Sequence, residues 1–330
     1  MNYSITATPP GTEEIVIPHT VAVSLEDFLS KDFPPRENLL APWLKSQSLN
    51  MLYAWRGIGK TFFSLEIAYA VASGGSFLGW TAPRPRGVLY IDGEMPGTVL
   101  QERIARIVNA SEKEAAPGAF RIITPDLQGA GMPNLSEREG QQEIDRHIDE
   151  ATELVIVDNL SCLVRGGGRE NDAESWLSVQ DWALRLRSRG KSVLFVHHAG
   201  KGWAQRVTSK REDVLDVVLL LKRPTNYEQS EGCHVEIHYE KARGLTGADV
   251  EPVEARLITE SDGTRRWEWN VSENALPEIV KELVDLGMGR KDIIRELKDV
   301  YGKSTATAYR LTEEYFPKGE KDREKPVRKS

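Results

Sequence analysis

The sequence predicts an α/β fold with a mostly parallel sheet, antiparallel edge strands and a small all-α part towards the C-terminus. Between residues 49 and 196, apolar strand patterns alternate with helical patterns, which is typical of a parallel sheet covered by helices. After residue 213, strand patterns are separated only by turns, which predicts antiparallel edge strands. After residue 276, three short helical patterns are separated by glycines, an arrangement typical of a helix-turn-helix.

The individual elements follow from apolar periodicity and from the Gly, Pro and Ser residues that separate them. Strand patterns begin at Leu49 and continue at Gly87–Asp92, Phe120–Thr124, Leu154–Asp158, Ser192–Val196, Val214–Leu221, His234–Lys241, Val253–Thr259 and Arg265–Trp269. Helical patterns cover Ser24–Leu29, a segment starting near Lys60, Leu100–Val108, Glu137–Glu150, Ala173–Arg189, Leu276–Leu286, Arg290–Tyr301 and Thr305–Tyr315. We therefore expect a lead-in segment over 1–45, an α/β domain over 46–272, a helical domain over 273–316 and a disordered charged tail over 317–330.

Charge and composition exclude some classes of protein. The net charge of −7 argues against a basic nucleic-acid binder as a whole, although residues 276–330 carry 13 Lys and Arg against 11 Asp and Glu. No apolar run approaches the length of a membrane span, and the first residues lack the pattern of a secretion signal. The two cysteines, Cys162 and Cys233, fit neither a metal site nor a disulfide framework, so we expect a cytoplasmic protein without membrane contact.

A phosphate-binding loop joins the first strand to the helix near Lys60. Residues 54–61 read AWRGIGKT, in which alanine replaces the usual first glycine. The two glycines let the backbone N–H groups point at phosphate oxygens, and the helix N-terminus adds positive charge. Lys60 is expected to contact the β- and γ-phosphates, and Thr61 to ligate Mg²⁺. The expected cofactors are ATP and Mg²⁺, and the expected nucleotide-binding residues here are Ala54, Arg56, Gly57, Ile58, Gly59, Lys60 and Thr61.

Polar residues at the ends of three further strands extend this interpretation. Asp158 ends the apolar strand LVIVD and is predicted to hold Mg²⁺, directly or through water. Glu94 follows the strand GVLYID and is a candidate to orient or deprotonate the attacking water; the alternative is a loop carboxylate at a sheet edge. Asp92 is expected to have a structural role. His197 and His198 end another buried strand, and His198 is the better candidate to sense the γ-phosphate. No cysteine or further histidine lies nearby in the sequence, which argues against zinc.

Residues 20–270 resemble the RecA-like core of hexameric replicative helicases, especially plasmid RepA-type helicases and related mobile-element ATPases. The resemblance rests on the P-loop, Glu94, the VIVDN strand, the HHAGK segment and a basic pair further on. It implies that Glu94 is the catalytic glutamate, that His198 senses the γ-phosphate and couples it to DNA, and that a basic finger reaches the neighbouring subunit's nucleotide. The segment EKARGLTG resembles the Lys-x-Arg finger of these helicases, which implies Arg243 as the finger and Lys241 beside it.

Two other basic groups are candidates for DNA contact. The first lies in residues 201–211, in a segment that resembles the family's mobile DNA-facing loop, and its members at 206–211 are the alternative finger. The second lies in the C-terminal helices, which resemble resolvase-like helix-turn-helix modules; a helical bundle for oligomer contacts is the alternative. The residues expected to contact DNA are Lys201, Arg206, Lys210, Arg211, Lys303 and Arg310.

These observations together predict a DNA-dependent ATPase that acts as a motor in plasmid or mobile-element replication. The resemblance implies a homo-oligomeric ring, a hexamer, that hydrolyses ATP at subunit interfaces and moves on single-stranded DNA, with duplex DNA bound by the helix-turn-helix. Two alternatives stay open: an ATPase for recombination or strand annealing, and a nucleotide-switched DNA-binding regulator without helicase activity. A mere switch needs neither a water-positioning Glu94 nor a trans-acting Arg243, so these two residues separate a motor from a switch.

Overall fold

The computed structural model describes residues 20–166, 171–198, 213–224, 227–261, 263–272, 276–301 and 303–316, without the side chains of residues 171–174 and 278. The chain forms two compact units, residues 1–35 and 36–330. In the first unit, helix α1 (Leu25–Ser30) begins at Ser24, whose hydroxyl accepts a hydrogen bond from the amide of Asp27, as expected for a capped helix. None of the residues of α1 is buried. The predicted tail after residue 316 lies outside the described residues.

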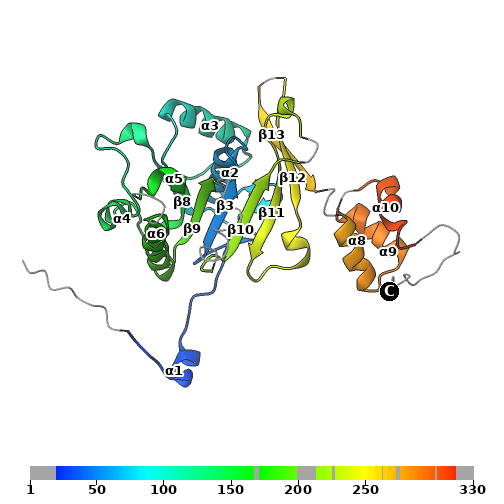
Figure 1. Cartoon of the computed structure of the whole chain (residues 1–330), viewed down its shortest axis with the longest axis horizontal. Helices are drawn as coiled ribbons and strands as arrows, with labels where there is room; N and C mark the ends of the chain where they lie inside the picture. The colour runs from blue at the N-terminus through cyan, green and yellow to red at the C-terminus, as the bar shows by residue number, and fades with distance from the viewer. Residues whose placement is uncertain are drawn as a thin grey trace, which may run out of the picture. The chain divides into compact units, whose positions relative to one another are not determined.

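The second unit contains a nine-stranded sheet with the order β13-β12-β11-β10-β3-β9-β8-β6-β7 (Figure 1). The six strands from β10 to β7 are parallel, and β11, β12 and β13 continue the sheet in antiparallel fashion. The predicted α/β fold class, with a mostly parallel sheet and antiparallel edge strands, is therefore confirmed. The strands of the sheet are β3 (Leu49–Ala54), β6 (Gly87–Asp92), β7 (Phe120–Ile123), β8 (Thr152–Asp158), β9 (Ser192–His198), β10 (Val217–Lys222), β11 (His234–Ala242), β12 (Val253–Thr259) and β13 (Arg265–Val271).

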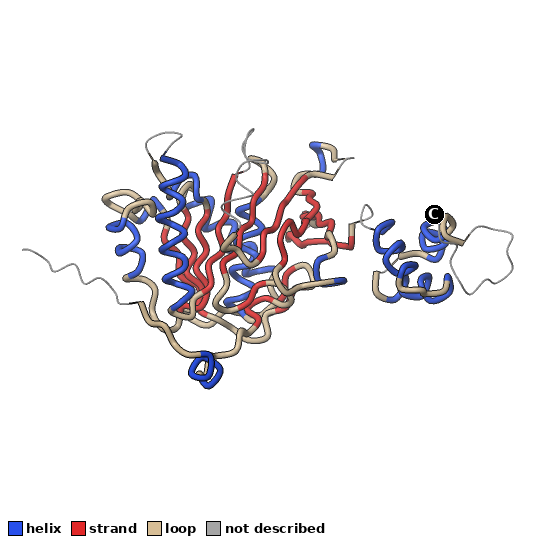
Figure 2. Tube along the Cα trace, turned by 60° about the horizontal axis from the view of Figure 1, so that its bottom comes forward, coloured by secondary structure: helices blue, strands red, loops and turns tan. Residues whose placement is uncertain are grey.

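Helices cover both faces of the parallel strands (Figure 2). Alternate residues of β3 point to opposite faces: Leu52 joins the core beneath α2, whereas Met51 joins the core beneath α6. Helix α2 ends at Gly74, whose left-handed backbone lets its N–H group bond to the carbonyl of Ala70. The helices of this α/β part are α2 (Lys60–Ser73), α3 (Gly97–Ala110), α4 (Arg138–Asp145), α5 (Leu160–Leu163) and α6 (Asn171–Ser188), with short 3₁₀ turns η1 (Pro125–Leu127), η2 (Gln229–Glu231) and η3 (Gly247–Val250).

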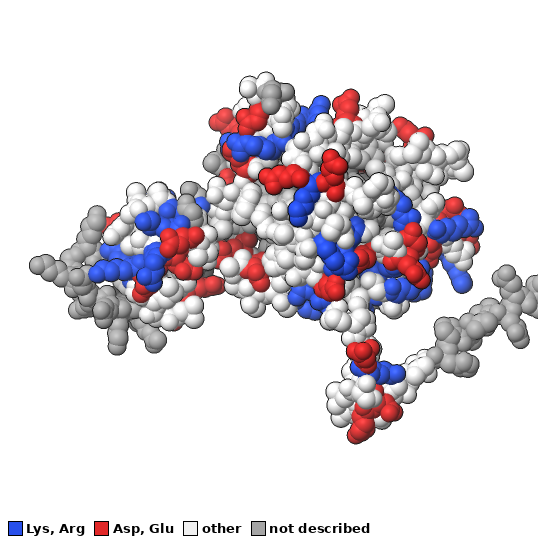
Figure 3. Space-filling view, turned by 180° about the vertical axis from the view of Figure 1, so that it is seen from behind, with Lys and Arg blue, Asp and Glu red and all other residues white. Residues whose placement is uncertain are grey.

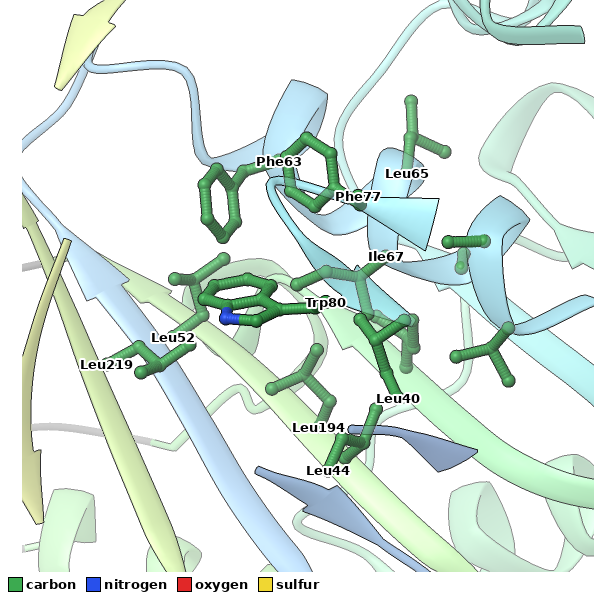
Figure 4. Close-up of a cluster of buried hydrophobic side chains, with 14 of the residues drawn as sticks. Leu40, Leu44, Leu52, Phe63, Leu65, Ile67, Phe77, Trp80, Leu194 and Leu219 are labelled. Carbon is green, nitrogen blue, oxygen red and sulfur yellow. The ribbon is translucent and has the colours of Figure 1, made fainter. Parts of the chain in front are cut away.

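The core beneath α2 includes two short hairpins that the sequence patterns do not reveal. One pairs β1 (Asn38–Leu40) with β2 (Leu44–Lys45), and the other pairs β4 (Ser76–Phe77) with β5 (Trp80–Thr81). Leu40 and Leu44 of the first hairpin lie in the same cluster as Trp80 of the second (Figure 4). The compact second unit therefore begins at residue 36, ten residues before the expected start of the α/β domain at residue 46.

The C-terminal helices have a core of their own. Helices α8 (Leu276–Asp285), α9 (Arg290–Asp299) and α10 (Thr305–Thr312) bury a small apolar cluster that includes Val280, Ile293 and Ala308. The Ser304 hydroxyl accepts a hydrogen bond from the amide of Thr307 and caps α10. Helical membrane spans are absent from the described part of the chain.

Candidate nucleotide site

The loop between β3 and α2 has the backbone of a phosphate-binding loop. Gly57 has φ of 76° and Gly59 has φ of 111°, both in the left-handed region that glycine adopts without strain. The side chain of Ile58 between them is buried and fixes the loop to the core. The N-terminus of the 14-residue helix α2 therefore follows directly on the loop, where its free N–H groups can bind an anion.

Lys60 lies across this loop. Its ammonium donates hydrogen bonds to the carbonyls of Ala54 at 3.1 Å and Trp55 at 2.9 Å, and the residue is 5% exposed. Burial lowers the pKa of Lys60 to about 8, although Asp158 and Glu94 nearby act to raise it. An additional anion next to the ammonium, such as a phosphate, would favour its charged form.

Asp158 lies close to the start of α2, and three hydroxyl groups contact its carboxylate. Tyr90 donates to its Oδ2 atom at 2.6 Å, Ser64 donates to the same atom at 3.2 Å, and the Thr61 hydroxyl also bonds to this carboxylate. Burial raises the pKa of Asp158, and these hydrogen bonds together with Lys60 act to lower it.

Thr61 and Asp158 fit a magnesium site of the kind found in nucleotide-binding proteins. Mg²⁺ there takes one or two protein oxygens, with water and substrate phosphates as the remaining ligands. A hydroxyl and a carboxylate that touch each other beside a phosphate-binding loop provide those two oxygens. Within the described residues, no group of three or more His, Cys, Asp or Glu is placed to hold a metal without such a substrate.

Glu94 occupies the loop after β6, and its side chain is 56% exposed. Its Oε2 atom accepts a hydrogen bond from the Asn159 amide at 2.6 Å, and it lies 3.6 Å from Nε2 of His198. Asn159 is buried and directly follows the last residue of β8; it is the last residue of the VIVDN stretch, and the sequence patterns indicate no role of its own for it. Burial lowers the pKa of His198, and the charge of Lys60 lowers it further, so the neutral imidazole is favoured near pH 7.

Asp92 has the structural role that was expected. Its carboxylate accepts hydrogen bonds from the amide of Met95 at 3.0 Å and from the Thr124 hydroxyl at 3.2 Å, so it shapes the loop that carries Glu94. Burial raises the pKa of Asp92 to about 6.

The order of the strands explains how these groups meet. In the sheet, Ala54 pairs with His198 and Asp92 pairs with Asp158, at the carboxyl ends of four adjacent parallel strands. Ligands of open α/β sheets bind at this edge. The structure therefore brings together Lys60, Thr61, Asp158, Glu94 and His198, which the sequence patterns had placed only one by one.

Arg243 and Lys241 lie at the opposite end of the parallel strands, away from the phosphate-binding loop. Because β11 is antiparallel to β10, the end of β11 at Ala242 lies beside the start of β10 at Val217. The guanidinium of Arg243 donates to the carbonyl of Asp213 at 3.3 Å and lies 3.9 Å from the Asp216 carboxylate. The Lys241 ammonium donates to the same Asp213 carbonyl at 3.3 Å.

The proposed DNA contacts divide into described and undescribed residues. Lys201, Arg206, Lys210 and Arg211 lie outside the described residues. The Lys303 ammonium donates to the carbonyl of Val271 at 3.2 Å, whereas Arg310 is exposed on α10.

Comparisons with known proteins give a family match and similar solved structures. A family model described as an AAA domain matches residues 14–204. Three solved structures are similar over about two thirds of the chain. A KaiC-like protein of Pyrococcus horikoshii OT3 is 13% identical with a TM-score of 0.48, covering 69% of this chain and 93% of its own. A DnaB-like replicative helicase, solved in a study of its interactions with primase, is 14% identical with a TM-score of 0.46, covering 65% and 57%. The flagellar accessory protein FlaH of Methanocaldococcus jannaschii is 12% identical with a TM-score of 0.45, covering 68% and 90%.

Proposed function

Since this chain belongs to the AAA domain family, we propose that it is a RecA-like, DNA-dependent ATPase that acts as a RepA-type ring helicase in plasmid or mobile-element replication. The observation that carries the hydrolytic part is the position of Glu94. An exposed carboxylate, held by Asn159 at 2.6 Å, lies among Lys60, Asp158 and His198 at the edge where a nucleotide binds.

Each residue of this group has a role in phosphoryl transfer. The loop N–H groups and Lys60 bind the β- and γ-phosphates and neutralise their charge. Thr61 and Asp158 would hold Mg²⁺, which would supply positive charge to neutralise the charge that develops on the phosphates. Glu94 orients the attacking water towards the γ-phosphate and accepts a proton from that water. Asn159 positions the Glu94 carboxylate through its amide hydrogen bond.

Coupling to single-stranded DNA is supported by His198. The imidazole lies 3.6 Å from Glu94 and ends β9. The chain continues directly from this residue into the segment with Lys201, Arg206 and Lys210, which the resemblance assigns to DNA. DNA bound by these residues would therefore act on Glu94 through His198.

Hydrolysis between subunits is supported by the position of Arg243. It follows the end of β11, at the end of the parallel strands opposite to the P-loop of its own chain. A finger at this position serves a nucleotide only in a neighbouring subunit, as a ring provides. A hexamer is proposed from the sequence resemblance.

The C-terminal helices support a second DNA contact. The exposed face of α10 carries Thr305, Tyr309 and Arg310, a combination suited to a groove and its phosphates. On the face of the molecule in Figure 3, Lys and Arg are interspersed with Asp and Glu.

The test is ATP turnover with and without single-stranded DNA, measured beside strand displacement on a forked duplex. A helicase shows turnover that rises with single-stranded DNA and unwinds the fork. DNA-stimulated turnover without unwinding would instead favour the recombination or annealing ATPase. Nucleotide binding without turnover would favour the switch. Lys60→Ala is the matched negative control, because it removes a contact to phosphate.

A further inference from the structure

A cavity of about 600 Å³ lies beside the phosphate-binding loop, within the size range of small-molecule sites. It opens between the start of α2, the turn η2 with the start of β11, the end of β12 and the start of β13. Phe62 is the wall contributed by α2, and it directly follows Thr61. The lining residues are Phe62, Ser230, Glu231, Gly232, Cys233, Arg256, Leu257, Ile258, Thr259 and Arg265.

Cys233 joins this cavity to the phosphate-binding loop. Its thiol donates to the carbonyl of Ile58 at 3.5 Å, and it is so close to Gly59 that a Cβ atom there would lie 2.6 Å from the sulfur. The cavity wall and the loop are therefore in direct contact. A ligand with phosphates on the loop and a further group of a few ångströms' length would extend into the cavity.

Two cationic side chains lie beside Phe62. The guanidinium carbon of Arg103 lies 4.1 Å from the centre of the Phe62 ring, and that of Arg265 lies 5.8 Å from it. Within the described residues, neither guanidinium forms an ion pair. Planar cations beside an aromatic ring, next to a phosphate-binding loop, are suited to a ligand that joins negative charge to an aromatic ring.

The hydrogen-bonding groups of the lining are already engaged or are weakly specific. Glu231 accepts from Arg256, from the amide of Glu228 and, at 3.0 Å, meets the ring of His234. The other polar lining side chains are hydroxyls, the Cys233 thiol and guanidiniums, without an amide. Such a lining favours stacking and shape over reading of the base edge.

We propose that this cavity holds the ribose and base of the nucleotide by stacking, with little discrimination between adenine and guanine. The proposal rests on the proposed function, since it assumes that the triphosphate binds to the P-loop. The ribose passes Phe62 and Cys233, and the base lies over the Arg265 guanidinium.

The affinities of two ligands distinguish binding to the phosphate-binding loop from binding to the cavity. MgATP fills the loop and the cavity, whereas magnesium tripolyphosphate fills only the loop. We expect the wild-type protein to bind ATP at least about tenfold more tightly than tripolyphosphate, the scale of one stacked base. Arg265→Ala is expected to weaken ATP by about threefold to thirtyfold and to leave tripolyphosphate unchanged. Ser230→Trp fills the cavity from its exposed rim and should give the same pattern.

The matched control is Arg266→Ala on the same strand. Arg266 bonds to Glu260 and Glu268 and does not line the cavity, so both affinities should stay at the wild-type value. An unchanged preference for ATP over tripolyphosphate in both Arg265→Ala and Ser230→Trp would overturn the proposal. So would equal losses for both ligands, or a preference above about a hundredfold for ATP over GTP. If neither ligand binds the wild-type protein, the proposed function itself fails.

Discussion

Glu66 makes the stability of this protein depend on pH in a direction opposite to that of most carboxylates. It lies on the P-loop helix and accepts a hydrogen bond from Trp267 Nε1 at 2.9 Å. Burial raises its pKa from the ordinary 4.5 to about 7, against the lowering effect of that hydrogen bond. Between these two pH values the folded protein binds a proton that the unfolded chain releases. The free energy of unfolding from this group therefore falls by about 3 kcal/mol as pH rises through the window.

The perturbation is Glu66→Gln, which is neutral at every pH and keeps an oxygen for Trp267. We expect the variant to match the wild type at pH 4.5 and to exceed it by about 3 kcal/mol at pH 8. The assay is urea unfolding followed by tryptophan fluorescence at several pH values. Glu143→Gln is the control, because it removes an exposed carboxylate paired with Arg146 and should change stability by less than about 1 kcal/mol throughout. Parallel pH profiles for Glu66→Gln and the wild type would refute the reasoning.

Four further predictions concern the proposed motor. Lys60→Ala should lose ATP binding in a titration while its circular dichroism stays native, because its ammonium contacts only loop carbonyls within the protein; retained affinity would contradict the P-loop assignment. Glu94→Gln should bind ATP normally yet hydrolyse it at least ~100-fold more slowly in single turnover, and near-normal turnover would move the base elsewhere. Arg243→Ala should lose ~10³–10⁵ in turnover and regain part of it when mixed with Lys60→Ala, because a mixed interface pairs an intact loop with an intact finger. If two co-assembled variants stay inactive, the finger lies in residues 206–211 instead. Deleting residues 276–330 should keep ATPase activity and weaken duplex binding in a gel-shift assay, and full duplex affinity would assign these helices to assembly.

Long periodic segments of the fold could be predicted from the sequence. The strands Gly87–Asp92 and Val253–Thr259 have the predicted ends, because turns or charged residues bound their apolar patterns. The hairpins β1–β2 and β4–β5 could not be predicted, since strands of two or three residues show no periodicity. Their burial depends on packing beneath α2, a contact between segments that are separate in the sequence.

The candidate site likewise contains residues that could be predicted from the sequence and residues that could not. Lys60, Thr61 and Asp158 belong to local motifs, so the sequence identifies each of them, and the structure shows that they lie together. Asn159 ends the VIVDN pattern, but its contact with Glu94 and the contact of Cys233 with Ile58 could not be predicted, because each joins residues at least 65 positions apart. An amide directly after the last acid of a buried strand was the one visible signal for Asn159.

Asp216 links Arg243 to the strand that leads to the phosphate-binding loop. Its carboxylate accepts the amide of Leu49 at 3.1 Å, the first residue of the strand that ends at the P-loop. The same carboxylate holds Arg36 at 3.3 Å and lies 3.9 Å from Arg243. In the proposed ring, where Arg243 acts on a neighbouring subunit, Asp216 would connect that contact to the first residue of the strand that leads to the phosphate-binding loop.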